Sequence, residues 1–331
     1  YFMIELFCVV GIKYFEGWIC MWVRYISFFI LSASMLYLVI YSIIFSFKFS
    51  LTAFFLLLVF GFSILYAIFT EFKAIKKSSK TKTTFNFLSL LCVFGGALST
   101  YFLNIYLSQG SIIAASLIGI IGSIFFPKYS LPIYTGAFVG MISPDFSHNF
   151  YHICAACIIA GFIYELSKEI FVGAGGKLGT IAFSSWLITY LIFDLTLLQS
   201  SFNYQIGYEL LLISFIGAIT TYVLYNYFSL DPVLSSALIS LIGALILPVI
   251  IPDLKNISPS VIMAATFAGM SSKKRENWYK MILISFIVPI FFTCSYCNLG
   301  GIGGKLGTIA FSSVLTIDGI FILLKDISYK N

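Results

Sequence analysis

The chain has 331 residues, of which 60% are apolar and only 10% are charged, and its mean hydropathy is +1.02. Water-soluble domains carry about 25% charged residues, so this composition excludes a soluble globule and indicates a polytopic membrane protein. The net charge of +6 does not indicate a nucleic-acid partner, because the basic residues gather in short loops that orient a protein in a bilayer. We therefore expect an all-α membrane protein whose surroundings are the lipid bilayer.

The N-terminal part, residues 1–82, is expected to hold about two helices followed by a basic loop. Charged residues interrupt the first apolar run, residues 1–23, so a helix on the membrane surface and a membrane span both fit it. Residues 25–47 and 51–72 are each near the roughly 20 residues that a helix needs to cross the hydrocarbon core. Residues 71–82 form the most basic loop, which the positive-inside rule places in the cytoplasm.

One stretch of eleven residues, GGKLGTIAFSS, occurs at positions 175–185 and again, without a change, at positions 303–313. Such identity within one chain indicates an internal duplication. The similarity extends upstream, because residues 95–127 align with residues 216–248. The expected divisions are residues 1–82 for the N-terminal helices and loop, 83–200 for the first transmembrane repeat and 201–331 for the second.

Each repeat contains five apolar elements, and the third holds a related hexapeptide, GAFVGM at 136–141 and ATFAGM at 265–270. This third element has about 13 residues, too few to cross a core about 30 Å thick as a simple helix. We expect a short or broken helix there, which a membrane tolerates only where protein or a water-filled cavity satisfies its backbone. The elements are residues 85–107, 111–127, 131–143, 150–167 and 173–197 in the first repeat, and 208–228, 232–248, 258–270, 278–296 and 301–324 in the second.

The number of crossings decides how the repeats are related. If all five elements cross, the second repeat is upside down relative to the first, about a pseudo-two-fold axis in the membrane plane. The basic residues 271–277 and the tail after Lys325 then join residues 71–82 in the cytoplasm, as the positive-inside rule requires. Four crossings would make the repeats parallel and would break that rule. We expect tandem, inverted repeats in a bacterial inner (plasma) membrane, with the C-terminus in the cytoplasm.

The repeated stretch has the chemistry of an anion site. Glycine lacks a Cβ, so the backbone can bend and approach a neighbour closely. A helix that starts there offers free N–H groups and the positive end of its dipole. Lys177 and Lys305 add positive charge, and in inverted repeats they approach from opposite sides. The predicted substrate-binding residues are Gly175, Gly176, Lys177, Thr180, Ser184, Gly303, Gly304, Lys305, Thr308 and Ser312, with Thr100 and Thr221 at matching positions upstream.

A structural role is the alternative for each of these residues. The stretch would then be a tight turn whose lysine reaches the lipid headgroups, with small residues that let helices pack closely. Thr100 and Thr221 would hydrogen-bond to a carbonyl of their own helix. Identity at all eleven positions favours the functional interpretation, because packing alone seldom requires it.

Seven cysteines include two CxxC pairs, Cys154 with Cys157 and Cys294 with Cys297. Two such pairs have the ligands for zinc or an iron–sulfur cluster, and a disulfide is a further alternative. The pairs do not occupy equivalent positions in the two repeats, and free cysteine packs as a small apolar residue. We expect packing, with no cofactor and no metal.

The sequence contains no motif for hydrolysis or group transfer, so it does not predict an enzyme. The first hypothesis is a membrane transporter or channel for a small polar or anionic solute, in which the two GGKLGTIAFSS motifs form a pseudo-symmetric translocation site. The alternative is a non-transporting membrane subunit that anchors or scaffolds a larger complex, with or without an intramembrane cofactor. A homo-oligomer and a larger membrane complex both stay open as assemblies.

Overall fold

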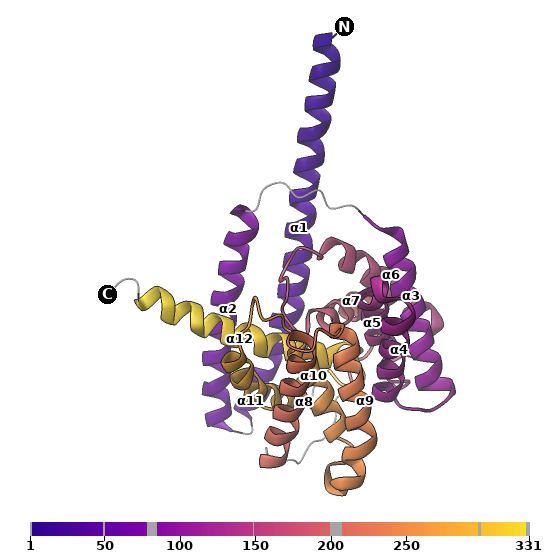
Figure 1. Cartoon of the computed structure of the whole chain (residues 1–331), viewed down its shortest axis with the longest axis vertical. Coiled ribbons are helices and arrows are strands. Elements are labelled where there is room, and N and C mark those ends of the chain that lie inside the picture. The colour runs from indigo at the N-terminus through magenta and orange to yellow at the C-terminus, as the bar shows by residue number, and fades with distance from the viewer. Residues whose placement is uncertain are drawn as a thin grey trace.

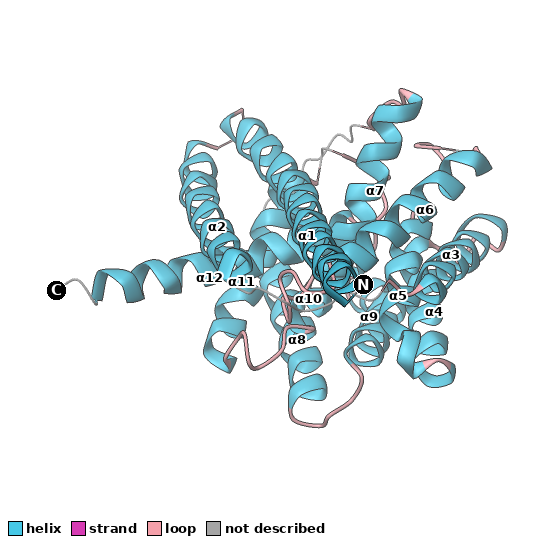
Figure 2. Cartoon of the chain, turned by 90° about the horizontal axis from the view of Figure 1, so that it is seen from above, coloured by secondary structure: helices cyan, strands magenta, loops and turns pink. Residues whose placement is uncertain are grey.

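The computed structural model describes residues 2–48, 50–77, 85–147, 149–198, 207–296 and 299–328, with side chains from Trp22 onward. These residues form twelve α-helices and no β-strand (Figures 1 and 2), which confirms the expected all-helical fold. Seven of the helices are long and apolar enough to cross a bilayer, as an integral membrane protein requires. They are Trp22–Phe47, Leu51–Lys76, Phe87–Tyr106, Tyr208–Asn226, Pro232–Ile250, Trp278–Ser295 and Lys305–Ser328.

Two long helices form the N-terminal part. The first, α1 (Phe2–Phe47), is one continuous helix of 46 residues, so the first apolar run leads directly into the span that follows it. Its N-terminal end projects beyond the rest of the protein (Figure 1). The second, α2 (Leu51–Lys77), ends where the basic loop begins, and residues 78–82 of that loop lie outside the described residues. Large apolar side chains point outward from both helices, for example Ile44 and Phe62, as lipid-facing positions require.

The remaining ten helices coincide with the ten apolar elements expected from the sequence, one helix in each. The short third elements are present as expected, and a π-helical turn at Phe102–Tyr106 continues the first element of the first half. The first five are α3 (Phe87–Tyr101), α4 (Ser111–Phe125), α5 (Ser130–Gly140), α6 (Phe150–Leu166) and α7 (Lys177–Phe193), and the second five are α8 (Tyr208–Asn226), α9 (Pro232–Ile250), α10 (Ser258–Gly269), α11 (Trp278–Ser295) and α12 (Lys305–Ser328).

Capping residues explain where several of these helices begin. The side chains of Asn86 and Asn149 accept hydrogen bonds from backbone N–H groups in the first turns of α3 and α6. Asp231 does the same for α9. Pro232 then occupies the first helical position of α9, where its missing N–H is no loss and its fixed φ suits a helix.

The short helices α5 and α10 lie in the interior of the protein. They contain 11 and 12 residues, and nearly all of their side chains are buried. Glycines allow them to lie against their neighbours: a Cβ added at Gly136 of α5 would be 1.9 Å from Val93 O of α3, and one at Gly269 of α10 would be 2.5 Å from Ala218 O of α8. Surrounding helices therefore shield two elements that are too short to cross a bilayer alone.

The first turns of α7 and α12 cross at the centre of the protein, and the two helices run outward from there in different directions (Figure 2). Gly179 and Gly307 form the crossing point. A Cβ added at Gly179 would lie 2.6 Å from Gly307 Cα, and a Cβ added at Gly307 would lie 2.5 Å from Gly179 Cα. The two backbones thus touch without intervening side chains, as in membrane helix pairs that meet through small residues.

Gly179→Ala and Gly307→Ala should each destabilise the protein by about 1–3 kcal/mol, because the new methyl group has to push two backbones apart. Gly95→Ala is the matched control: Gly95 is an exposed helical glycine with nothing within 4 Å of its added Cβ. Alanine there should be neutral or stabilising by about 0.5–1 kcal/mol. Thermal unfolding in detergent measures all three, and equal stability of the crossing variants and the control would contradict the close backbone contact.

Candidate functional site

The two copies of the repeated motif begin with loops of the same backbone shape. We call residues 171–176 the first glycine loop and residues 299–304 the second glycine loop. Each loop has a positive φ at three matched positions, a conformation that glycine adopts readily and other residues rarely do. The loop shape therefore explains the glycines at the last two of these positions. The matched residues are Phe171 (49°) and Leu299 (57°), Gly173 (76°) and Gly301 (74°), and Gly176 (82°) and Gly304 (84°).

Each glycine loop binds the other half of the chain. The carbonyl oxygen of Gly173 accepts a hydrogen bond of 3.0 Å from the N–H of Ser272, which follows α10. In the same way, Gly301 O accepts one of 2.9 Å from the N–H of Ser143, which follows α5. The two halves thus exchange equivalent contacts.

The predicted site glycines lie against backbone atoms at these contacts. A Cβ added at Gly175 would be 2.5 Å from Ala268 O, and one at Gly303 would be 2.4 Å from Phe138 O. Gly176 and Gly304 start α7 and α12 and lie equally close to the opposite helix. All four are buried, so they serve close packing between the halves.

The two lysines extend away from the helix crossing. Lys177 Nζ donates a hydrogen bond of 2.5 Å to Ser167 O, at the C-terminal end of α6. Lys305 Nζ donates one of 2.7 Å to Ser295 O and one of 3.2 Å to Tyr296 O, at the end of α11. Each ammonium group thus satisfies carbonyls that have no partner within their own helix and faces the negative end of its dipole.

The hydroxyl groups of the motif bond to their own helices. Thr180, Ser184, Thr308 and Ser312 are buried, and each donates to the carbonyl oxygen four residues earlier. Ser184 also lies 2.6 Å from the hydroxyl of Ser34, which connects α7 to α1. None of these four residues lines the cavity described below.

Thr100 and Thr221 lie where the short helices meet their neighbours. A Cβ added at Gly140 would be 2.8 Å from Thr100 Cβ, and one at Gly269 would be 2.8 Å from Thr221 Cβ. Both hydroxyl oxygens are buried without a hydrogen-bond partner, so neither bonds to a carbonyl of its own helix. Their matched positions support the sequence alignment, and their surroundings are packing contacts.

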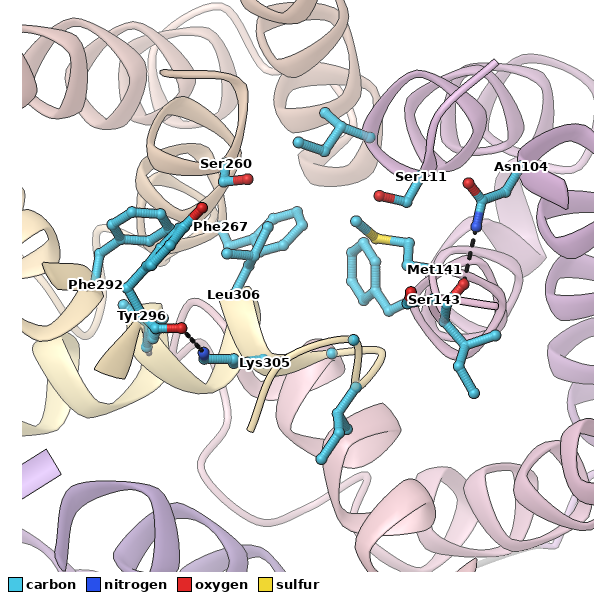
Figure 3. Close-up of a pocket in the computed structure, with 18 of the residues that line it drawn as sticks. Asn104, Ser111, Met141, Ser143, Ser260, Phe267, Phe292, Tyr296, Lys305 and Leu306 are labelled. Atoms are coloured by element: carbon cyan, nitrogen blue, oxygen red, sulfur yellow. Dashed lines mark hydrogen bonds between the residues drawn. The ribbon is translucent and has the colours of Figure 1, made fainter. Parts of the chain in front are cut away.

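A cavity of about 370 Å³ lies beside the second glycine loop (Figure 3). Gly304 and Lys305 are the predicted site residues that line it; Lys177 and the other predicted residues do not. Figure 3 shows Ser111 and Met141 facing Ser260, Phe267 and Leu306 across the space, with Lys305 held at its edge by the carbonyl oxygen of Tyr296. The lining residues are Asn104, Ser111, Ile112, Phe138, Met141, Ile142, Ser143, Pro144, Ser260, Phe267, Phe292, Tyr296, Gly300, Gly301, Ile302, Gly304, Lys305, Leu306 and Ile309.

The cavity can accept a small polar molecule. Its polar lining includes the side chains of Ser111, Ser143 and Ser260, and Asn104, whose amide donates a hydrogen bond of 3.0 Å to Ile142 O. Lys305 is the single charged residue among the described residues that line it. The start of α12 lies at the same place, so the positive end of that helix dipole adds to the lysine.

A pair of phenylalanines borders the cavity where the two halves meet. Phe138 and Phe267 occupy the same position in the aligned hexapeptides, and their ring centroids are 4.5 Å apart. Both rings are almost fully buried, at 1% and 2% exposure. Neither residue was predicted from the sequence, although their shared position in the hexapeptide was a signal for them.

The described cysteines form no metal site. Cys92, Cys154, Cys157 and Cys294 are free thiols. No group of three or more metal-ligating side chains occurs within the described residues. Cys297, the last member of the second CxxC pair, lies outside them.

No protein-family model, curated protein or solved structure matches this chain.

Lys177→Met and Lys305→Met should each lower the free energy of unfolding by about 1–3 kcal/mol, because each removes charged hydrogen bonds to helix-end carbonyls while keeping an apolar side chain. Lys128→Met is the control, since Lys128 is exposed and its Nζ lies over the ring of Tyr129, 5.7 Å from the centroid. Chemical or thermal unfolding in detergent compares the three variants. Wild-type stability in both capping variants would rule out the capping role.

Proposed function

We propose that this protein is a membrane transporter for a small polar or anionic solute and that the cavity beside the second glycine loop is its binding site. The observation that carries the proposal is the cavity itself, which lies between the two halves of the chain and is lined by hydroxyls, an amide and one lysine. Its volume falls in the range of roughly 300–1,000 Å³ that is usual for small-molecule sites. Of the predicted motif residues, this proposal keeps Gly304 and Lys305 as solute contacts. The other motif glycines hold the two halves together, Lys177 caps the end of α6, and the motif hydroxyls bond within their own helices.

The reciprocal contacts support a two-fold relation between the halves. Ser143 binds the second glycine loop as Ser272 binds the first, and Gly304 lies against Gly179 as Gly176 lies against Gly307. Such an exchange is what a two-fold axis produces. Tandem repeats related in this way form the central site of many secondary transporters.

The distribution of charge favours inverted repeats over parallel ones. The first glycine loop lies next to the basic residues 271–277 and to Glu71 near the end of α2, where the Phe171 N–H donates to its carboxylate. The second glycine loop lies next to residues 141–147, which carry Asp145 and no lysine or arginine. Because the basic residues 271–277 and the C-terminal end of α2 lie beside the first glycine loop, we assign the two glycine loops to opposite faces and the first to the cytoplasm.

A small anion is the solute that this lining favours. Lys305 and the start of α12 supply positive charge, and the hydroxyls of Ser111, Ser143 and Ser260 offer both donors and acceptors. The apolar remainder, which includes Ile112, Met141 and Leu306, limits the number of polar groups that the solute can satisfy. A compact carboxylate or a neutral polyol fits this balance better than a metal cation, because no carboxylate is among the lining residues.

Lys305→Gln and Lys177→Gln form a matched pair, because both lysines cap a helix and only Lys305 lines the cavity. Uptake of radiolabelled formate, acetate, lactate, phosphate and glycerol into proteoliposomes is the measurement. We expect at least one of these solutes to enter. Lys305→Gln should slow an anion about tenfold or more, which corresponds to about 1.4 kcal/mol of lost binding. Lys177→Gln should transport at close to the wild-type rate.

Equal loss of uptake in both variants would mean that the lysines act through stability alone. If folded wild-type protein takes up none of the five solutes, the transport proposal fails and the non-transporting membrane subunit becomes the better account.

A further inference from the structure

A cluster of charged side chains lies at the first glycine loop, on the face opposite to the cavity in the proposed arrangement. Arg275 is at its centre: Nε is 2.8 Å from Asp318 of α12, and Nη2 is 3.4 Å from Glu71 of α2. Lys280 of α11 is 3.5 Å from both Asp318 and Glu276. The cluster thus joins three helices to the loop between α10 and α11.

Glu276 has too few partners for an ionised carboxylate. Its side chain is fully buried, at 0% exposure, and neither carboxylate oxygen accepts a hydrogen bond. Lys280 at 3.5 Å is beyond the usual length of a charge-assisted hydrogen bond, about 2.7–2.9 Å. Arg275 is committed to Asp318 and Glu71. A buried charge without hydrogen bonds is costly, and a carboxyl group in this position is expected to bind a proton instead.

The neighbouring carboxyl group of Asp318 can share the proton that Glu276 binds. The Glu276 carboxyl group lies near that of Asp318, because Lys280 Nζ is 3.5 Å from an oxygen of each, and the two can share a hydrogen bond when one of them is protonated. Two adjacent buried carboxyl groups readily share one proton, because both cannot be ionised at low cost. From α8, Tyr222 fixes the backbone by donating a hydrogen bond of 2.6 Å to Glu276 O. Lys177 also lies near the cluster and interacts electrostatically with Glu71 and Arg275.

Burial and, after it, the neighbouring Asp318 carboxyl together raise the pKa of Glu276 to about 9, against the opposing effects of Lys280 and Arg275. An exposed glutamate has a pKa of about 4.3. The folded protein therefore binds this proton more tightly than the unfolded chain does. The stability that this group contributes is full below about pH 4, declines as the pH rises towards about 9 and is constant above that.

The same cluster fastens the first glycine loop. Arg275 donates to Val172 O at 3.4 Å, the Phe171 N–H donates to Glu71 at 3.0 Å, and Ser272 binds Gly173. The second glycine loop has no counterpart of this cluster, because the sequence alignment places Phe146 and Tyr190 at the positions of Arg275 and Asp318. The first loop is therefore held by hydrogen bonds from and to residues of an ion-pair cluster, whereas the second loop borders the cavity.

We propose that Glu276 and Asp318 form a proton-binding site whose occupancy controls the hold of Arg275 on the first glycine loop. When the O–H bond of Glu276 breaks, its electron pair stays on the carboxylate and the proton passes to water at the basic face. The new negative charge repels Asp318 and competes for Arg275, so the contacts to Glu71 and Val172 weaken. The link to transport rests on the proposed function: the proton is the coupling ion, and its release opens the basic face.

Infrared difference spectroscopy of the purified full chain tests the proton site without reference to transport. The wild type should show the C=O band of a protonated carboxyl at neutral pH that disappears as the pH passes about 9. Glu276→Gln should lack this band at every pH. Glu209→Gln, in the first turn of α8 and away from the cluster, is the matched control and should keep it.

A second variant keeps the proposal testable if Glu276→Gln does not fold. Asp318→Asn leaves Glu276 titratable and removes one cause of its raised pKa, so the band should persist and disappear at a lower pH. Absence of the band in the wild type, its survival in Glu276→Gln, or an unchanged titration in Asp318→Asn would overturn the proton site.

Uptake into proteoliposomes under an imposed pH gradient tests the coupling. With any solute of the panel above that enters, the gradient should accelerate the wild type and should leave Glu276→Gln unchanged. A normal infrared band without uptake of any solute would contradict the proposed function and would still support the proton site. If the gradient changes uptake equally in the wild type and in Glu276→Gln, only the coupling between the proton site and transport is contradicted.

Discussion

The structure depends on the contact between two backbones at Gly179 and Gly307. Helices in a bilayer gain no hydrophobic free energy by leaving lipid for each other, so close packing and satisfied polar groups have to hold them together. At this crossing the helices touch directly, and Gly176 and Gly304 extend the contact into the loops. In a reciprocal contact each position faces the equivalent surroundings in both copies. This constraint gives a physical reason for eleven identical residues, because a substitution in one copy would no longer fit the unchanged residue that it contacts in the other copy.

The surroundings of the two loops differ although the loops themselves have the same shape. At the first glycine loop, Arg275 donates a hydrogen bond to Val172 O and forms ion pairs with Glu71 of α2 and Asp318 of α12. At the second loop, Phe146 occupies the aligned position and packs edge-on against Trp186, with ring centroids 5.9 Å apart, and the cavity lies nearby. In an inverted-repeat transporter, a glycine loop fixed at one face and a cavity beside the glycine loop at the other face would correspond to one of the two alternating states. The difference between the two loops then defines which groups have to change for the other state to form.

Much of the fold could be predicted from the sequence because hydrophobic length and glycine placement act locally. The apolar runs located all ten helices from α3 to α12, and the small number of residues in the third runs explained the buried α5 and α10. The direction of the lysines was not predictable in this way. Lys177 and Lys305 reach the ends of the preceding helices, and this requires α6 to return beside α7 and α11 beside α12. Only the packed structure brings those carbonyls within reach.

The candidate site could be predicted from the sequence less well than the fold, for a related physical reason. The hydroxyls of Thr180 and Ser184 bond to their own helix, which a periodic pattern does not distinguish from a surface facing a solute. The cavity takes Asn104 from the end of the first element and Ser143 from the loop after α5, and the crossing of the halves brings them to Lys305. Polar residues at the ends of apolar elements were the available signal. Their convergence depends on the tertiary arrangement.

The relation between the two halves is the claim on which the proposed binding site and the orientation in the membrane depend. Ser143→Cys and Ser272→Cys, each made in a chain whose seven native cysteines have been replaced, test it through labelling with a membrane-impermeant maleimide. These two serines are partly exposed and bind the two glycine loops in the same way. Inverted halves predict that Ser143→Cys reacts only from the outer face and Ser272→Cys only from the cytoplasmic face. Labelling of both from one face would contradict the account.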